Sequence, residues 1–408
     1  SRNCPKGSIF FALKGDKFDG NQYAGKALAS GCVYAVIDNP DYYIGERTIL
    51  VDNVLKTLQQ LAHHHRKVLG LPIIGITGTN GKTTTKELLA AVLSTKFNLL
   101  YTEGNFNNHI GVPLTLLRLT HDHEMAVIEM GASHPGDIKE LVDIVHPNYG
   151  IITNVGRAHL EGFGSFEGVI RTKGELYDYI RRSKGKIFIK KENEYLQSIA
   201  KGIEQITYGN GDDAFASGQV VSCDPFLVFN WKQQGKLHTV ETHIIGSYNL
   251  DNVLAAVAVG RFFKIPAERI SRAIAAYEPT NNRSQFKKTD NNELIIDAYN
   301  ANPSSMKVAL DNFITMPVQP KAIILGDMRE LGPTSDELHA EVVEQIKKGQ
   351  FDKVFLCGEH FSKVSKEFSP FATTEAMVEE LRKQPLKGYH ILIKGSHSMG
   401  LEKLADIL

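Results

Sequence analysis

From residue 73 onward, short apolar runs alternate with longer segments whose apolar positions recur every three or four residues. The runs PIIGIT, MAVIEM and YGIITNV are apolar almost throughout, which predicts parallel strands that are buried on both faces. The segment behind the first run predicts a helix, whose apolar face comprises Leu88, Leu89, Val92 and Leu93. We therefore predict a central α/β unit with a parallel sheet, an architecture typical of nucleotide-binding proteins.

Different patterns surround this central unit and divide the chain. Residues 1–70 predict a small N-terminal α/β unit, with strands at IFFAL and YAVID and a helix at VLKTLQQLAHHHRKVLG. Between about 204 and 245, two apolar runs that flank QQGK predict antiparallel strands appended to the central sheet. A helix over 248–262 follows, and the polar stretch YEPTNNRSQF ends the central unit near residue 283.

A third unit resumes the alternation of strand and helix and predicts a Rossmann-like domain, with strands at ELIIDAY, KAIILGD, KVFLCG and HILIKGS. Its first helix is expected to begin at Pro303 with Asn302 as the cap. Thr334 and Glu337 have the spacing of a capping box for the next helix. The expected domains are 1–70, 71–283 and 284–408.

The composition is that of a folded protein without a strong net charge. The chain has 408 residues, of which 42% are hydrophobic and 23% charged, so two or three domains are expected. Lys and Arg number 46, as do Asp and Glu, which predicts no whole-chain attraction to nucleic acid or to an anionic membrane. The four cysteines form no CxxC pair and no stretch has membrane-spanning length, so we expect a cytoplasmic protein. Because SRNCPKG begins abruptly, we also expect residues upstream of it.

The strongest chemical signal is GITGTNGKTT, at the end of the first apolar run. Two residues separate Gly78 from Gly81 and five separate Gly75 from Gly81, whereas the usual phosphate loop has four before GK[ST]. Glycines still allow backbone N–H groups to turn inward at a helix N-terminus and bind phosphate. Lys82 is suited to the β- and γ-phosphates and the Thr83 hydroxyl to Mg²⁺. We therefore favour nucleotide binding over a glycine turn with a chance GKT.

Acidic and histidine side chains near neighbouring strand ends are candidates for a metal site. Glu129 ends a predicted strand, where a glutamate that faces water is the commoner case, but the nearby phosphate loop favours a metal role. His159 follows the strand YGIITNV and could reach the same edge, although such a histidine is more often structural. The triplet at 63–65 points to different faces of a helix, so a surface role is favoured over metal binding.

Several sequence motifs, and the order in which they occur along the chain, resemble those of a known family. They are GITGTNGKTT, TEGNFNNHIGVP, IEMGAS, GRAHLEGFGS, the helix near 249–256, IIDAYNANPSSM, LGDMRELG and KGSHSMGLEKL. Together they resemble the Mur ligases along nearly the whole chain, and most of all the branch that adds D-alanyl-D-alanine. The phosphate motif of this family is GTxGKT, which residues 78–83 match in full.

The resemblance implies an ATP-dependent amide ligase of three domains. A carboxylate resists amine attack because its oxygen is a poor leaving group, so γ-phosphoryl transfer would first make an acyl phosphate, from which the amine displaces phosphate. Such chemistry needs positioning and charge neutralisation rather than a nucleophilic triad. The implied cofactors are ATP and two Mg²⁺ ions, and the implied partners are UDP-N-acetylmuramoyl-tripeptide and D-Ala-D-Ala. A monomer without nucleic-acid or membrane partners is expected.

When the functional positions of the family are matched to this sequence, the resemblance implies a phosphate site formed by Gly78, Thr79, Asn80, Gly81, Lys82, Thr83 and Thr84. Asn252, Arg283 and Asp297 match positions that contact the base, phosphate and ribose in relatives. Arg283 also has the planar donor fork that suits a phosphate.

The resemblance further implies that Thr83, Glu129 and His159 serve the magnesium sites and that Lys82 acts in catalysis with them. Lys173 in RTKGELYD matches the lysine that the family carbamylates. A carbamate is an anionic metal ligand, whereas an ammonium beside two Mg²⁺ ions would be repelled. Without the resemblance, Lys173 is interpreted as a helix-surface lysine.

The implied substrate candidates fall into groups: Asn107 and Asn108 for the sugar-peptide, Asn300, Asn302 and Ser305 for the dipeptide, and Lys14, Asp19 and Gly20 for the uridine end. Asn302 has an equally favoured alternative role as a helix cap alone. The chain departs from the family at His397 and Gly400, where arginines are common, and at Tyr248, where histidine is usual. Contacts at these three positions are not carried over.

Three other classes of protein share parts of these motifs. The lysine- or diaminopimelate-adding sister ligase is expected to have a DNPR-type motif where this chain has NANPSSM, which favours the dipeptide-adding branch. Folylpolyglutamate synthase shares the ATPase core but should lack the uridine-binding first domain. A regulatory GTPase or motor could use a GKT loop, yet the sequence has no NKxD guanine motif.

Overall fold

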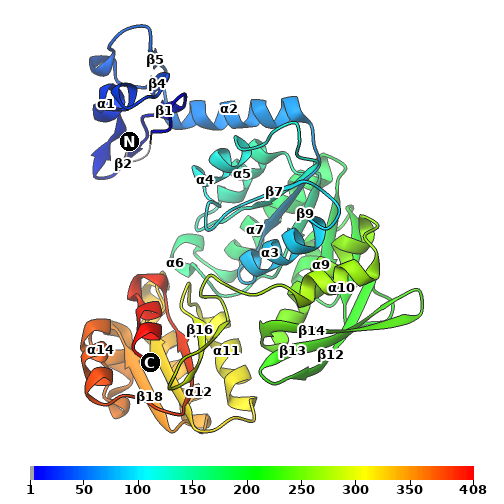
Figure 1. Cartoon of the computed structure of the whole chain (residues 1–408), viewed down its shortest axis with the longest axis vertical. Helices are drawn as coiled ribbons and strands as arrows, with labels where there is room; N and C mark the ends of the chain where they lie inside the picture. The colour runs from blue at the N-terminus through cyan, green and yellow to red at the C-terminus, as the bar shows by residue number, and fades with distance from the viewer. Residues whose placement is uncertain (1–3) are drawn as a thin grey trace.

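The computed structural model describes residues 4–408, which form a small N-terminal unit, a nine-stranded central sheet and a five-stranded C-terminal sheet. The long helix α2 (Val54–Leu69) joins the N-terminal unit to the central one (Figure 1). The arrangement confirms the predicted α/β class, with a parallel central sheet, appended antiparallel strands and a Rossmann-like third unit. Boundaries at 70/71 and 283/284 remain our proposal. Within the described residues, no helix is long and apolar enough to cross a membrane.

The N-terminal unit contains a parallel sheet, a short hairpin and one helix. Its elements are β1 (Ile9–Phe11), β2 (Lys14–Gly15), β3 (Phe18–Asp19), α1 (Ala24–Ala29), β4 (Tyr34–Ile37) and β5 (Thr48–Leu50). Helix α2 packs against helices of the central unit. There His63 Nδ1 bonds to the carbonyl of Ile144 and His65 Nε2 to that of Leu119, so both imidazoles serve this packing.

The central sheet has the strand order β14-β13-β12-β11-β10-β9-β6-β8-β7. Its parallel strands are β6 (Ile73–Thr77), β7 (Leu99–Tyr101), β8 (Met125–Glu129), β9 (Tyr149–Ile152), β10 (Lys186–Lys190) and β11 (Glu204–Gly209). The appended strands are β12 (Ala216–Cys223), β13 (Phe226–Gln233) and β14 (Lys236–Ile245). The chain leaves β6 toward one side of the sheet and later continues on the other, so the end of β6 is a topological switch point, where ligands bind in such sheets.

Helices cover both faces of the central sheet because side chains alternate along its strands. Ile74 and Ile76 join one core and Ile73 the other. The first core contains α3 (Lys82–Leu93), α9 (Leu250–Phe262) and α10 (Ala267–Ala275). The second contains α4 (Gly111–Leu116), α5 (Asp137–Val145), α7 (Phe166–Arg182) and α8 (Glu194–Ile199).

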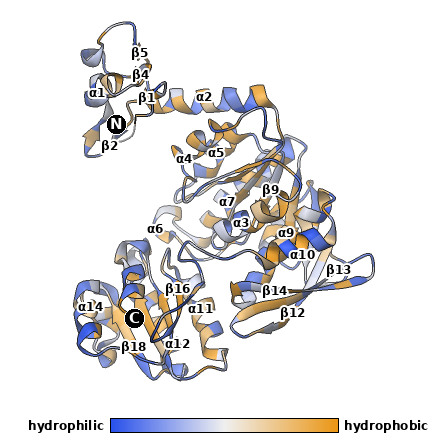
Figure 2. Cartoon of the chain, viewed as in Figure 1, coloured by the Kyte–Doolittle hydropathy of each residue, from blue (hydrophilic) through white to orange (hydrophobic). Residues whose placement is uncertain are grey.

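The C-terminal sheet has the order β15-β16-β19-β17-β18, with β15 antiparallel at one edge. Its strands are β15 (Gln285–Lys288), β16 (Glu293–Asp297), β17 (Lys321–Gly326), β18 (Lys353–Cys357) and β19 (His390–Lys394). Its helices are α11 (Pro303–Thr315), α12 (Ser335–Lys348), α13 (Glu359–Val364) and α14 (Thr374–Lys383). Figure 2 shows apolar residues concentrated on strands such as β18 and polar ones along the outer helix α14.

The two predicted helix caps of this unit have different outcomes. Asn302 Oδ1 accepts the Ser305 N–H at 2.9 Å and Ser305 Oγ accepts the Asn302 N–H at 3.1 Å, which confirms the cap of α11. The capping box of Thr334 and Glu337 is wrong, because the Thr334 hydroxyl instead donates to the Leu331 carbonyl at 3.0 Å. A 3₁₀ turn leads directly into α12, so Thr334 has near-helical dihedrals (φ −84°, ψ 5°) rather than the extended ones of a cap.

Candidate active site

A cavity of about 840 Å³ lies where the loops at the carboxyl ends of the central strands face the start of the C-terminal unit. Most of the predicted site residues line it. The exceptions are Gly78, Thr83, Lys173, Asn302 and, in the N-terminal unit, Lys14, Asp19 and Gly20. The structure thus brings together groups from residue 79 to residue 305 that the sequence predicted separately.

Two glycines with left-handed backbone shape the turn after β6. Gly78 has φ 141° and Gly81 has φ 76°. A Cβ on Gly78 would lie 2.0 Å from Thr153 Oγ1, and one on Gly81 would lie 2.7 Å from Asn252 Oδ1. Neither position accepts an L side chain without displacing a neighbour, which explains why both residues are glycine.

The same turn leaves several backbone N–H groups without a protein acceptor. Those of Thr79 and Asn80 donate to the carbonyl and the side-chain oxygen of Asn154, each at 3.0 Å. The next N–H groups, those of residues 81–84, have no acceptor anywhere in 4–408. They lie at the N-terminus of α3, the positive end of the helix dipole, and so form a site for an anion.

Lys82 lies over this turn. Its Nζ donates to the carbonyls of Gly78 at 2.8 Å and Thr79 at 3.0 Å. Burial lowers the pKa of Lys82 to about 8, against the attraction of Glu129 and with added repulsion from Arg283. An anion in the turn would further favour the charged form of the amine, because a nearby negative charge raises the pKa of Lys82.

Glu129 ends β8 beside the turn and is 1% exposed. Its Oε1 accepts the Thr83 hydroxyl at 3.3 Å and the Asn107 amide at 2.9 Å. Its Oε2 is buried and has no hydrogen-bond partner within the described chain. A buried carboxylate oxygen without a partner is costly unless a cation is nearby, so Glu129 with Thr83 fits a divalent ion.

His159 directly precedes the short helix α6 (Leu160–Phe163). This helix lies between the central and C-terminal units (Figure 1). His159 has a left-handed φ of 50°, and its Nδ1 pairs with the carboxylate of Glu330 in the C-terminal unit. Burial lowers the pKa of His159, against the attraction of Glu330. No short sequence pattern links these two residues, and the sequence analysis did not find Glu330.

Lys173 is buried in α7, which corrects its interpretation as a surface lysine: it is only 2% exposed. Its Nζ donates to the Ala132 carbonyl at 3.3 Å and lies 5.2 Å from the centroid of the Phe163 ring. Burial holds the pKa of Lys173 well below its usual value, and repulsion by Lys82 lowers it further. The signal for burial was present in the sequence, because Val169, Lys173 and Leu176 share one helical face.

The candidates for base and ribose form a polar cluster at the start of the C-terminal unit. Arg283 Cζ lies 3.9 Å from the centroid of the Tyr299 ring, and its Nε is buried without a partner in the part of the chain described. Asp297 accepts Lys394 Nζ at 2.5 Å and the Ser284 N–H at 3.2 Å. Tyr299 and Lys394 line the cavity but were missed, because their roles depend on contacts distant in sequence.

Two of the positions that depart from the family pattern lie in the same cluster. The Tyr248 hydroxyl hydrogen bonds to Ser284 Oγ at 2.8 Å. The His397 ring stacks on Tyr299 with 5.5 Å between the ring centroids. Asn252 lies beneath the turn, where its Oδ1 accepts the Thr85 hydroxyl at 3.0 Å.

Several substrate candidates already have protein partners. Asn302 Nδ2 donates to Asn80 Oδ1 at 2.8 Å, so this residue caps α11 and also ties it to the turn. Asn108 Oδ1 accepts the backbone N–H groups at the start of α4. Asn300 is exposed in the cavity, and Ser305 lines it while completing the cap of α11.

The candidates for the uridine end lie in the N-terminal unit, apart from the main cavity. Lys14 pairs with Asp38 at 2.9 Å, and Asp19 Oδ1 accepts the side-chain amide of Asn21 at 2.7 Å. A Cβ on Gly20 would lie 2.3 Å from the Leu13 carbonyl oxygen. Asp38 and Asn21 complete this network, and the sequence analysis did not single them out.

A glycine turn at the switch point of a parallel sheet, a lysine over it and a buried carboxylate beside it define a phosphate-loop protein of three α/β units. Family models of the Mur ligases match along the chain: the family catalytic domain at 1–66, the middle domain at 76–260 and the glutamate ligase domain at 282–397.

Individual relatives extend this match. A UDP-N-acetylmuramoyl-tripeptide–D-alanyl-D-alanine ligase of Bacillus subtilis is 34% identical over 100% of this chain and 92% of its own. The crystal structure of MurF from Acinetobacter baumannii has a TM-score of 0.89 and 29% identity, covering 100% of this chain and 91% of that one. MurF from Thermotoga maritima in complex with ADP has a TM-score of 0.88 and 26% identity, covering 100% and 95%. The chain belongs to the Mur ligase family, and within it to the MurF branch.

Proposed function

We propose that this protein is an ADP-forming ligase that uses ATP to join D-alanyl-D-alanine to UDP-N-acetylmuramoyl-tripeptide in peptidoglycan precursor synthesis. The observation that carries the proposal is the open turn, in which the N–H groups of 81–84 lack an acceptor among residues 4–408, next to the unpartnered Oε2 of Glu129. The names of the relatives from B. subtilis and T. maritima support the reaction and the nucleotide.

The first step activates the terminal carboxylate of the tripeptide. One of its oxygens attacks the γ-phosphorus of ATP, the bond from that phosphorus to the β,γ-bridging oxygen breaks, and ADP leaves with the electron pair. The product is an acyl phosphate. We assign the unpartnered N–H groups of 81–84 and the ammonium of Lys82 to the transferring phosphate, where they would stabilise the charge that moves onto its oxygens.

The second step forms the amide. The neutral amine of D-alanyl-D-alanine attacks the acyl carbon, the bond from this carbon to the phosphate oxygen breaks, and inorganic phosphate leaves while nitrogen loses one proton. We assign the dipeptide to the side of the cavity where Asn300 and Ser305 lie. Asn107 and Asn108 are assigned to the sugar-peptide, and Lys14, Asp19 and Gly20 to the uridine end.

The proposal includes Mg²⁺ held by Thr83, Glu129 and His159. When bound, Mg²⁺ would neutralise the β- and γ-phosphate oxygens. No three His, Cys, Asp or Glu side chains converge on a possible metal position between residues 4 and 408. This fits an ion that takes one or two carboxylates and completes its coordination with phosphate and water. We assign Asn252, Arg283 and Asp297 to the base, phosphate and ribose.

We also propose that Lys173 is carbamylated. Only a neutral amine adds to carbon dioxide, and burial, by lowering the pKa of Lys173, raises its neutral fraction near neutral pH. Replacement by Ala should lower activity strongly, and added formate or acetate should restore part of it. Lys139→Ala, at an exposed lysine, is the control. A complete failure of small carboxylates to restore activity would count against a carbamate.

The overall reaction is tested by measuring ADP release with both substrates and with each omitted in turn. Sustained release should require both. Omitting the dipeptide should allow no more than about one turnover, because the acyl phosphate has no amine to react with. Sustained ADP release without the tripeptide would identify a simple ATPase and contradict the proposal.

A further inference from the structure

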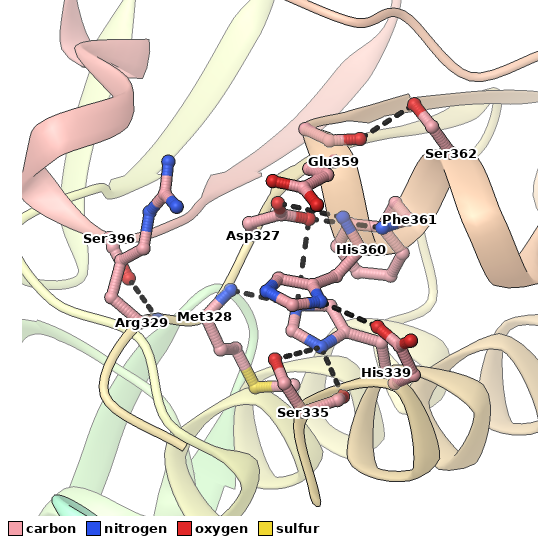
Figure 3. A network of polar contacts seen from close by, with 12 residues as sticks. Asp327, Met328, Arg329, Ser335, His339, Glu359, His360, Phe361, Ser362 and Ser396 are labelled. Carbon is pink, nitrogen blue, oxygen red and sulfur yellow. Dashed lines mark hydrogen bonds and ion pairs between the residues drawn. The ribbon is translucent and has the colours of Figure 1, made fainter. Parts of the chain in front are cut away.

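The loop at 327–332, in the segment LGDMRELG, is anchored to other elements of the C-terminal unit at consecutive residues. Asp327 is fully buried, and its carboxylate accepts the N–H groups of His360 at 3.0 Å and Phe361 at 3.1 Å (Figure 3). A Cβ on Gly358 would lie 2.2 Å from Asp327 Cγ, so this close approach requires glycine. The start of the loop is therefore fixed against α13.

The next two residues are fixed by side chains from other elements. The Met328 N–H donates to His339 Nε2 at 3.0 Å, and the Arg329 N–H donates to Ser396 Oγ at 3.0 Å (Figure 3). His339 Nδ1 lies 2.6 Å from the Ser335 carbonyl, so it carries the proton that leaves Nε2 free to accept. Helix α12 and the segment after β19 thus hold the loop from two sides.

These anchors present Glu330 to the central unit. Glu330 has a left-handed φ of 62°, uncommon for a residue with a side chain, and is followed by Leu331, which is 2% exposed in the core. The Glu330 side chain is 59% exposed, and its carboxylate meets His159 Nδ1. The Glu330 carbonyl lies 3.5 Å from the N–H of Glu161, a second link to α6.

We propose that Glu330 is a positioning residue for His159. Its carboxylate accepts the Nδ1–H of His159, which fixes the tautomer and leaves Nε2 as the free nitrogen for a metal ion. Because the two residues belong to different units, the orientation of His159 depends on the docking of the C-terminal unit. This inference rests on the metal role of His159 proposed above.

The alternative is an ordinary surface ion pair that contributes only to docking. Exposed pairs of this kind contribute little to stability, and their removal leaves a metal site unchanged. Removing a carboxylate that orients a metal-binding histidine instead typically costs roughly 10–100-fold in metal affinity or activity. Metal affinity therefore separates the two roles where stability does not.

The test measures Mn²⁺ binding to the full chain in the presence of ADP by electron paramagnetic resonance. Glu330→Ala should raise the Mn²⁺ Kd roughly 10–100-fold. Glu330→Gln, which keeps an oxygen acceptor for Nδ1–H, should restore most of the affinity. Glu359→Ala, at an exposed glutamate paired with Lys363 in the same unit, should leave it unchanged. Thermal unfolding of each variant establishes that the fold is intact.

A double variant shows whether Glu330 acts through His159. In the His159→Ala background, Glu330→Ala should cause no further loss of Mn²⁺ affinity, because the orienting bond is already absent. A wild-type Kd in Glu330→Ala, or additive losses of affinity in the double variant, would overturn the role of Glu330 but leave the proposed metal role of His159 intact. If His159→Ala itself left Mn²⁺ binding unchanged, the proposed metal role of His159 would fail first.

Discussion

Two turns that follow buried strands use their backbone N–H groups in opposite ways. In the turn after β6, the N–H groups of 81–84 find no acceptor in the part of the chain that the structure describes. After β17, the N–H groups of Asp327, Met328 and Arg329 donate to the Cys357 carbonyl, His339 Nε2 and Ser396 Oγ. The first turn is left open for an anion, whereas the second is closed by the protein itself and holds one side chain outward.

The largest expected effect tests the open turn. Lys82→Ala should lower ATP-dependent ADP release by roughly 10²–10³, the usual cost of removing one preorganised donor to developing charge. The fold should persist, because the Lys82 Nζ bonds only to carbonyls of the turn. Steady-state turnover measures the effect, with Lys232→Ala as a control at an exposed lysine. Unchanged turnover would mean that the turn does not bind the transferring phosphate.

The pH dependence of ATP binding provides a second test of Lys82 in the open turn. The Lys82 pKa of about 8 lies below that of an unfolded lysine, so the free protein loses this ammonium as the pH rises through 8. ATP affinity should therefore fall between pH 7 and 9, and Lys82→Ala should remove most of that fall. The effect on stability has the opposite sign: burial penalises the charged form, so this group costs stability below pH 8, and that cost disappears as the pH rises from 8 toward 10.5. Titration calorimetry at several pH values measures the affinity.

A substitution in the closed turn should lower the stability of the protein rather than its affinity for nucleotide. Asp327→Ala leaves the N–H groups of His360 and Phe361 without their charged acceptor and should cost roughly 1.5–3 kcal/mol. ADP affinity measured without divalent metal should stay at the wild-type value, because the open turn is not in contact with Asp327. Hydrogen exchange at the start of α13 and calorimetry with ADP measure the two effects. A large loss of ADP affinity would erase the distinction between the turns.

The two turns also differ in how far the sequence predicts them. The open turn depends on neighbours in sequence, Gly78, Gly81 and Lys82 behind an apolar strand, so a local pattern identifies it. The closed turn depends on His339 and Ser396, which approach it only in the folded chain. No periodicity encodes such contacts, and the Glu330 partner of His159 could not be predicted.

The burial of a charged residue is the second feature that could not be predicted from the sequence. Strands, helix faces and the appended antiparallel strands follow from apolar periodicity, and these predictions are confirmed. Lys173 lies on the apolar face of α7, but lysine is almost never fully buried without a partner, so its residue type and its position lead to opposite predictions. The same conflict between type and position can mark a functional residue.

Two glycines with the same φ allow the cost of a left-handed backbone to be distinguished from the effect of a side chain in the phosphate turn. Gly81 and Gly202 both have φ 76°, so Ala at either should cost about 1–2 kcal/mol from the left-handed conformation. At Gly202 a Cβ meets no atom within 4 Å, whereas at Gly81 it would lie 2.7 Å from Asn252 Oδ1. Gly81→Ala should weaken ADP binding and Gly202→Ala should not, as measured by calorimetry. Equal affinities would mean that the turn tolerates the added methyl group.

The smallest expected effect compares the two helix starts that border these turns. Asn302→Ala removes the side-chain oxygen that accepts the Ser305 N–H and should destabilise the start of α11 by about 1 kcal/mol. Thr334→Ala should change α12 by only a few tenths, because the Thr334 side chain makes no cap bond. Hydrogen exchange of the first amides of α11 and α12 measures both, and equal protection losses would contradict the assignment of the caps.

Asn302→Asp then separates the cap from the link to the open turn. Asp keeps the oxygen that accepts the Ser305 N–H but lacks the Nδ2 donor that reaches Asn80 Oδ1 at 2.8 Å. Protection of α11 should therefore stay near wild type while ADP affinity falls slightly, because Asn80 loses its contact with the C-terminal unit. If ADP affinity is unchanged while α11 stays protected, Asn302 stabilises its own helix and has no effect on the open turn.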